Sequence, residues 1–222
     1  MATTVYQQET SSFDRALGFF DAIYGFAVTL LVVNIDVTTP EAWSSLDAFF
    51  TGGVGSQLLG FTISFVVIVG FWRRNHYVLA NVTGIDSAVV TINIVLAGCI
   101  VFIPFTTQGM SDPHTAELPL PNAVYAVNIA LAVLAQSVLL QVAARRGLVS
   151  EPLNRRQLRV RALDALVAPA VFLASIPVAY LTDGNTAKLC WLALIPLGPL
   201  SARLVRRADM SGTEVNPRPD TR

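Results

Sequence analysis

Six long apolar stretches separated by short polar segments dominate the pattern of the chain. A helix of about 20 apolar residues crosses the roughly 30 Å hydrocarbon core of a bilayer, and each stretch is close to that length. Helices satisfy their own backbone hydrogen bonds inside lipid. The pattern therefore predicts an all-α integral membrane protein with six transmembrane helices, over residues 17–35, 54–71, 87–105, 122–143, 163–181 and 187–204.

Lysine and arginine residues are confined almost entirely to alternate connections. If the N-terminus lies in the cytoplasm, the cytoplasmic segments hold all but one of the 15 Lys and Arg residues, the exception being Lys188. Cytoplasmic loops of membrane proteins collect these residues. An odd number of spans would scramble the alternation, so we expect six spans with both termini in the cytoplasm.

Composition agrees with this assignment and limits the domain organisation. The 222 residues are 53% hydrophobic and 14% charged, and 15 basic residues balance 15 acidic ones, so nothing in the charge points to nucleic acid. Six spans leave no room for a sizeable soluble domain. We expect one six-span domain over residues 1–208 and a disordered cytoplasmic tail over residues 209–222, which is polar and lacks periodicity.

The sequence lacks the common signatures of catalysis and metal binding. It contains no serine nucleophile motif and no phosphate-binding loop. The two histidines, His76 and His114, fall on opposite sides of the membrane, and the two cysteines lie in separate apolar stretches. We therefore predict that the protein is not an enzyme and holds no cofactor or structural metal.

The segment 144–164, between the fourth and fifth stretches, is rich in arginine. One interpretation is a short interfacial helix beside anionic headgroups. The other is a solvated segment that fixes the topology. The sequence alone leaves both open.

Ionisable groups near the cytoplasmic end of the first span need partners, because a charge at the centre of a membrane helix costs about 2.5–3.5 kcal/mol. Asp21 lies about one turn inside this span, and Arg15 lies on another face of the helix. The second span ends with Trp72 and His76 at the same cytoplasmic level. We predict a polar network of these four residues, which serves either as a structural clamp or in gating and proton sensing through His76.

A stripe of regularly spaced residues follows Asp21 in the first span. Phe26, Leu30 and Val33 recur at i, i+4 and i+7 with Thr29 alongside, so they share one helical face. Such a stripe ordinarily faces lipid or packs in the core, and lining a pore is the alternative.

The opening of the first span resembles a known motif. Arg15, Phe19 and Asp21 in RALGFFD are similar to the Arg-x-x-x-Phe-Ser-Asp motif that opens the first helix of the lysosomal and bacterial potassium channels named transmembrane protein 175. The end of the second span, FWRRNH, and part of the third, INIVLAGCIVFIPF, are also similar to that family. The resemblance covers about the first half of the chain.

The resemblance implies a homotetrameric, potassium-preferring channel of a bacterial plasma membrane, with four copies of the first helix around the pore and potassium as the permeant ion. A hydrophobic constriction on that helix would act as gate and selectivity element. The residues at its positions are Phe26, Thr29, Leu30 and Val33. The residues of the motif and of the network that would hold the first helix against the second are Arg15, Phe19, Asp21, Trp72 and His76.

Other interpretations stay open at this point. A secondary or proton-coupled transporter would use Asp21 and His76 as a proton relay, although spans one to three and four to six show no convincing repeat. A non-conducting scaffold is a further alternative. The chain also departs from the family at Phe20, where the motif has serine, and at Phe26, where isoleucine or leucine is usual.

Overall fold

The computed structural model describes residues 5–7, 10–36 and 40–213. Six of its helical segments are long and apolar enough to cross a membrane. The chain is therefore an all-α, multi-pass membrane protein with six candidate transmembrane helices, as the apolar pattern predicts. In chain order the elements are β1 (Val5–Gln7), α1 (Ser11–Val33), η1 (Pro40–Trp43), α2 (Leu46–Phe49), η2 (Phe50–Val54), α3 (Gly55–Ala80), β2 (Gly84–Asp86), α4 (Ser87–Ser111), α5 (Pro119–Arg145), α6 (Arg155–Leu181), α7 (Gly184–Leu189), η3 (Cys190–Ala193) and α8 (Leu194–Thr213).

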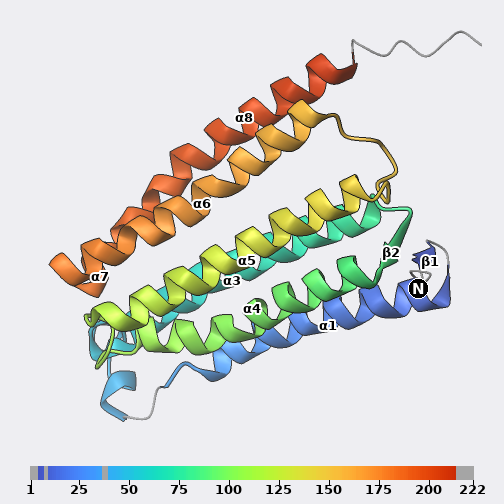
Figure 1. The fold of residues 1–222 in the computed structure, drawn as a ribbon. Helices are drawn as coiled ribbons and strands as arrows, with labels where there is room; N and C mark the ends of the chain where they lie inside the picture. Colours follow the sequence, from blue (N-terminus) through green and yellow to red (C-terminus); the bar gives the residue numbers. More distant parts are fainter. Residues whose placement is uncertain (1–4, 8–9, 37–39, 214–222) are drawn as a thin grey trace, which may run out of the picture.

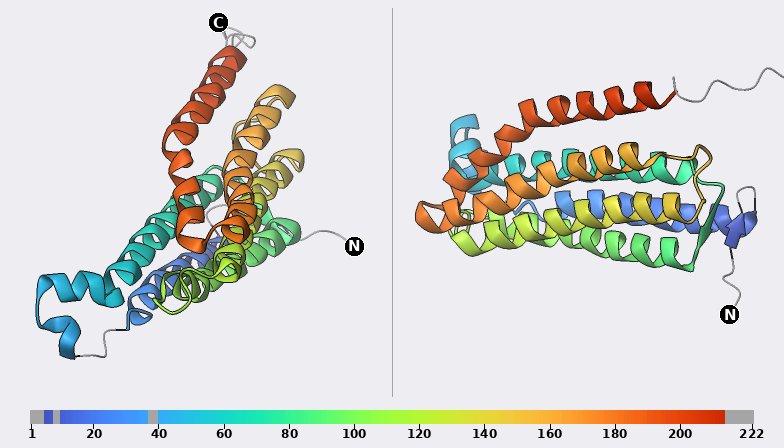
Figure 2. Two further views of the ribbon diagram at one scale, coloured as in Figure 1. Left: turned by 90° about the vertical axis from the view of Figure 1, so that its left-hand side faces the viewer. Right: turned by 45° about the horizontal axis from the view of Figure 1, so that its top comes forward.

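The long helices form an elongated bundle in which neighbours along the chain often lie side by side (Figure 1). The helix α4 packs against α5, α1 and α3, whereas α6 lies between α5 and α8. Figure 2 shows α8 at the edge of the bundle. The strand β1 and the end of α8 lie at the same end of the molecule, as an even number of antiparallel spans requires (Figure 1).

Two buried apolar clusters hold the bundle together. The smaller cluster lies at the end of the bundle that carries the β-strands, where Phe13 of α1 packs against Val78 and Leu79 of α3. The larger cluster joins α1, α3, α4, α5, α6 and η3. Its buried members include Tyr24, Leu31, Ile68, Phe71, Leu96, Ile100, Tyr125, Ile129, Phe172 and Trp191.

A two-stranded antiparallel sheet ties the start of the chain to the connection between α3 and α4. Val5 pairs with Asp86 in the register of β1 and β2. The Asp86 carboxylate also accepts a hydrogen bond from the Val89 backbone N–H, which caps the start of α4, and forms an ion pair with Arg146 at the end of α5. The ends of α1, α4 and α5 are thus joined at one level.

The helices extend beyond the predicted apolar stretches where arginines follow or precede them. The helix α3 continues to Ala80, past Arg73 and Arg74. The helix α6 begins at Arg155, where Asn154 and Gln157 form a capping box. Long arginine side chains reach the headgroup region from a helix that is still continuous. The second half of the arginine-rich segment is therefore the start of the fifth span, and a separate interfacial helix was the wrong interpretation.

The sixth span is broken into α7, η3 and α8 rather than forming one continuous helix. Pro196 and Pro199 lie in the first two turns of α8. Proline has no backbone N–H, so neither residue can donate a hydrogen bond to the preceding turn. At the other end α8 continues to Thr213, past the predicted domain boundary at residue 208. The remainder of the predicted disordered tail, 214–222, lies outside the described residues.

Candidate functional site

The helix α1 has two distinct faces. One face carries Phe20, Tyr24, Ala27 and Leu31, which are at most 3% exposed and pack toward α3 and α4. Burial of these apolar side chains fixes the rotation of α1 about its own axis. The bulky Phe20, which stands at the serine position of the motif, belongs to this buried face.

The opposite face of α1 carries the predicted stripe and is uncovered in the subunit. Phe26 is 70% exposed, Leu30 is 45% exposed and Val33 is 74% exposed. Phe19 is 59% exposed and continues the stripe toward the start of the helix. At 3.6 residues per turn, these side chains and Thr29 fall within about 100° of arc. The stripe is a continuous apolar surface with one hydroxyl group in it.

The hydroxyl of Thr29 has one defined hydrogen bond. Its Oγ1 donates to the Phe26 backbone carbonyl over 2.8 Å. The single hydroxyl proton is therefore used within the helix, and the oxygen keeps its lone pairs as acceptors. A cation passing along this face would find an oxygen ligand at Thr29 between apolar neighbours.

A polar contact joins α1 to α3 near the inner end of the stripe. The Trp72 indole Nε1 donates to the Asp21 carboxylate over 2.9 Å. The His76 ring, one turn further along α3, stacks on Trp72 with ring centroids 5.7 Å apart. Asp21 and Trp72 also line a groove of about 460 Å³ between the two helices. The structure thus brings together three residues of the predicted network.

Arg15 and Phe19 do not join this contact. Among the residues that the structure describes, the Arg15 guanidinium has no ion-pair or hydrogen-bond partner, and its place in the network stays a prediction. The six-residue separation turns Arg15 about 120° around α1 from Asp21, onto another face of the helix. The Phe19 ring lies near Phe20, with centroids 5.6 Å apart, and otherwise faces outward on the side of the stripe.

A second set of hydrogen bonds fixes the other end of α1. Asn34, the residue directly after α1, joins this end of the helix to α4. Its side-chain Nδ2 donates to the Pro104 carbonyl over 2.9 Å. Gln57 of α3 accepts from the Asp36 backbone N–H over 2.6 Å and donates to its carbonyl over 3.2 Å. Sequence reasoning missed this contact, although a polar Asn34 directly after the stripe was a usable signal.

Polar groups inside the bundle fix α3 against its neighbours. Ser64 of α3 shares hydrogen bonds of 2.7 Å with Thr107 of α4 and 3.1 Å with Tyr125 of α5. Gln136 of α5 donates to the Phe71 carbonyl of α3 over 3.1 Å. Buried polar groups in lipid are stable only with such partners. The helix α3 is therefore a fixed support for α1.

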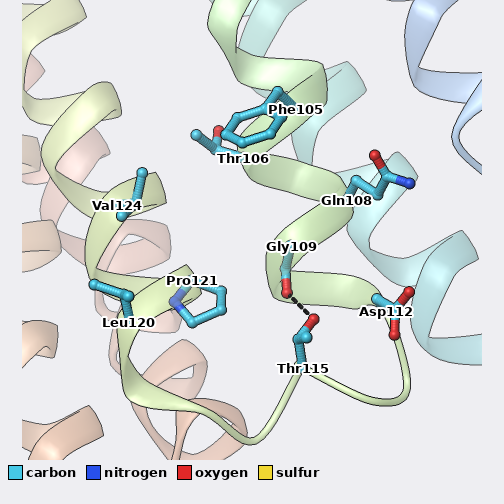
Figure 3. A pocket seen from close by; sticks show the side chains of 9 residues that line it. All are labelled: Phe105, Thr106, Gln108, Gly109, Asp112, Thr115, Leu120, Pro121 and Val124. Carbon is cyan, nitrogen blue, oxygen red and sulfur yellow. Dashed lines mark hydrogen bonds between the residues drawn. The ribbon is translucent and has the colours of Figure 1, made fainter.

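A pocket of about 370 Å³ lies between the ends of α4 and α5 (Figure 3). Phe105, Leu120 and Val124 supply apolar walls. The hydroxyl of Thr115 donates to the Gly109 carbonyl over 2.6 Å. The lining comes from α4, α5 and their connection, without a residue of α1, so this pocket is separate from the stripe.

Within the described ranges, no group of three or more His, Cys, Asp or Glu side chains is arranged to hold a metal ion. Cys99 and Cys190 are free thiols. The candidate site is accordingly a surface of apolar and hydroxyl side chains on α1 with a polar contact near each of its ends.

Part of the first half of the chain is similar to a known family. Residues 15–104 match the sequence profile described as the endosomal/lysosomal potassium channel TMEM175. This range includes α1 from Arg15 onward, all of α3 and the part of α4 up to Pro104.

Curated bacterial proteins show the same relationship. A potassium channel of Chamaesiphon minutus is 23% identical over 195 residues, which cover 84% of this chain and 94% of that protein. A potassium channel of Chryseobacterium is 21% identical over 131 residues, which cover 59% of this chain. The match spans 65% of the length of the Chryseobacterium protein, slightly less than two thirds.

A solved structure shares the fold. The crystal structure of a lysosomal potassium-selective channel TMEM175 homolog from Chamaesiphon minutus superposes with a TM-score of 0.64. The superposition covers 90% of this chain and 99% of that chain at 20% sequence identity. The arrangement of the six candidate spans is therefore a TMEM175-like fold.

Proposed function

We propose that the chain is a member of the TMEM175 family, a family of ion channels rather than enzymes, and that it is a potassium-preferring channel that assembles as a homotetramer. We place it in a bacterial plasma membrane, since its curated relatives are bacterial. The distribution of the 15 Lys and Arg residues supports cytoplasmic termini. The potassium preference is inferred from the bacterial relatives, which are described as potassium channels.

Four copies of α1 around a common axis would form the pore. One subunit supplies a single α1, whose stripe faces away from its own bundle. A closed pore therefore needs several copies, each turning the stripe inward. The tetramer would place rings of Phe26, Leu30 and Val33 at successive levels, with Thr29 hydroxyl oxygens between the rings.

The chemistry of these rings fits a hydrophobic gate. A narrow apolar constriction expels water, so a cation would have to lose its hydration shell to enter. The cation stays out until the constriction widens and fills with water. The Thr29 oxygens would offer a cation partial compensation for lost water. The Phe26 rings, which replace the aliphatic residue usual in the family, would narrow the constriction or present their faces to the ion.

The single observation that carries this proposal is the contrast between the two faces of α1. The stripe stays uncovered while the opposite face is buried, and α1 is hydrogen-bonded to α3 at its middle and to α4 just beyond its last residue. An uncovered apolar stripe also fits a helix that faces lipid. Thr29 within the stripe, and the position of the stripe directly after the family motif, favour the pore.

Substitution of Leu30 by asparagine tests the gate. In vesicles with an outward potassium gradient, Leu30→Asn should raise the resting flux several-fold, because an amide in the constriction keeps it wet. Val32→Asn is the matched control, since Val32 is an exposed neighbour that lies off the stripe. Both proteins should retain the wild-type elution volume on gel filtration.

Three outcomes would contradict the proposal. Wild-type vesicles without ionophore-independent potassium flux would remove the channel, and equal sodium and potassium fluxes would remove the preference. An equal effect of Leu30→Asn and Val32→Asn would move the pore away from the stripe.

Saturable counterflow would instead indicate a transporter. A proton relay needs Asp21 and His76 within hydrogen-bonding reach, directly or through water. In the structure Asp21 accepts from the Trp72 indole, and His76 stacks on the same ring. That arrangement supports a clamp between α1 and α3 more than a relay.

A further inference from the structure

A basic groove runs along the last turns of α3, outside the proposed pore. Its volume is about 620 Å³, and its polar and aromatic lining is supplied by Trp72, Arg73, Arg74, His76 and Tyr77. Gly70 lies at one end of it, where a side chain would meet no neighbour within 4 Å. The groove is therefore an open surface on one helix rather than a gap between two.

The length of α3 places this groove at the level of the lipid headgroups. The helix has 26 residues and is thus about 39 Å long, which exceeds the roughly 30 Å hydrocarbon core. The part from Gly55 to Trp72 spans about 27 Å by itself. Arg73 and the residues after it therefore lie where one leaflet carries its phosphate groups.

The charge of the groove is neutralised only in part by its surroundings. Arg73 has no ion-pair partner among the described residues, and none of the residues that line the groove is acidic. Arg74 has one long ion pair, with 4.0 Å between its Nη1 and the Asp164 carboxylate, and its side chain is 41% exposed. Such an exposed, long pair contributes little, so Arg74 remains available to a second anion.

We propose that this groove binds the headgroup of an anionic phospholipid from the leaflet that faces the arginine-rich end of the bundle. The planar guanidinium of Arg73 matches two phosphate oxygens, and Arg74 adds a second positive charge. Tyr77 and Trp72 are amphipathic rings of the kind that settle at the membrane interface. Binding at this site does not depend on ion conduction, so it stands apart from the proposed function.

The groove is next to the contact between α1 and α3. The Trp72 indole N–H is committed to Asp21, so a bound headgroup would touch the ring of Trp72 and not its donor group. The acyl chains would continue from Gly70 along the apolar surface of α3, where Val66 is exposed. A lipid held there would lie against the helix that supports α1.

Native mass spectrometry of the full-length protein in mild detergent tests the proposal. Phosphatidylglycerol should bind more tightly than phosphatidylcholine, whose choline group cancels the phosphate charge. Arg73→Gln should weaken phosphatidylglycerol binding about fivefold, the effect of one basic residue near an anionic surface. Arg73→Lys keeps the charge without the planar pair of donors and should retain part of the binding. Arg159→Gln, at an exposed arginine of α6 outside the groove, should retain it all.

The proposal is overturned if the two lipids bind equally well or if Arg159→Gln weakens binding as much as Arg73→Gln. It is also overturned if millimolar inorganic phosphate displaces the lipid completely, because the groove would then be a site for free phosphate. Unchanged thermal unfolding of Arg73→Gln confirms that the loss is not a folding defect. If Arg73→Gln unfolds, a titration of salt with the wild-type protein replaces it, and added salt should weaken the preference for the anionic lipid.

Discussion

The indole of Trp72 ties α3 to α1 through one hydrogen bond to the Asp21 carboxylate. Hydrogen bonds to charged groups contribute about 1.5–3 kcal/mol, and partial exposure of both side chains reduces this value. We expect Trp72→Phe to lower the free energy of unfolding by about 1 kcal/mol, because the ring remains and the donor is lost. Thermal unfolding in detergent measures the change.

The control for this substitution is Trp43→Phe. Trp43 is exposed, its ring packs on Phe49, and its indole N–H donates no hydrogen bond to a described residue. Asp21→Asn keeps an acceptor oxygen and should cost less than Trp72→Phe. An equal loss of stability in Trp43→Phe would show that the hydrogen bond to Asp21 contributes nothing specific.

Asp86 couples stability to pH at the end of the bundle that carries the strands. Burial alone raises the pKa of its carboxyl, but the hydrogen bond from the Val89 N–H and the ion pair with Arg146 outweigh burial and lower the pKa below its usual range. A carboxyl with a lowered pKa in the folded state stabilises the protein above the pKa of the unfolded chain. That contribution is lost as pH falls below about 4 through the folded value.

We therefore expect the wild-type protein to lose stability on acidification from pH 5 to pH 3, because protonation of Asp86 removes its ion pair with Arg146. Asp86→Asn should be less stable at neutral pH and show a weaker dependence over that interval. Unfolding followed at several pH values measures both effects. An unchanged pH profile in Asp86→Asn would assign the dependence to other carboxyl groups.

Single residues also show how far sequence reasoning reaches. The level of Asp21 and Trp72 followed from the topology, because both lie at the same end of adjacent antiparallel spans. Whether the two side chains touch depends on how each helix is rotated about its own axis. The buried side chains of the whole bundle determine that rotation. Arg15 illustrates the limit, since it shares that level with Asp21 but lies on another face of α1.

At the scale of elements, Gly60 sets the distance between α3 and α4. A Cβ atom at this position would lie 2.5 Å from the Ser111 Cβ, so the two helices could not keep their separation. We expect Gly60→Ala to destabilise the protein by about 1–3 kcal/mol, the usual cost of overpacking. Unfolding in a series of denaturant concentrations measures this loss.

Gly98→Ala is the matched control on α4, because a Cβ there would meet nothing within 4 Å. Alanine has the higher helix propensity, by about 1 kcal/mol in water, so this variant should be neutral or more stable. Equal destabilisation of the two variants would show that the cost is not local to the contact between Gly60 and Ser111.

The extents of the helices were harder to predict than their number. The apolar pattern predicts only the part of a helix that lies inside the hydrocarbon core. It therefore did not predict that α3 and α6 continue through arginine-rich turns outside it. It also missed η1, α2 and η2, which are too short to show a period. The break between α7 and α8 depends on prolines whose effect on a helix varies with the packing around them.

At the scale of the whole molecule, the proposed pore requires an assembly of several subunits. Light scattering of the protein purified in mild detergent should give a protein mass four times the 23.9 kDa of one chain. Substitution of the stripe residue Phe26 by a smaller side chain should leave this mass unchanged if the stripe faces the pore lumen. A strictly monomeric wild-type protein would contradict the channel proposal.

The attachment of α1 to its own subunit restricts how a pore built from it could change width. The contacts at Asp21, Asn34 and Asp36 lie at the middle of α1 and just beyond its last residue. Sliding α1 by one turn, about 5.4 Å, would break all of them together. Turning a stripe side chain to another rotamer costs only about 0.5–1.5 kcal/mol even in a strained position. Widening is therefore cheaper by side-chain rotation, by a bend between the two attachments, or by tilting each subunit as a rigid body that carries α1 with it.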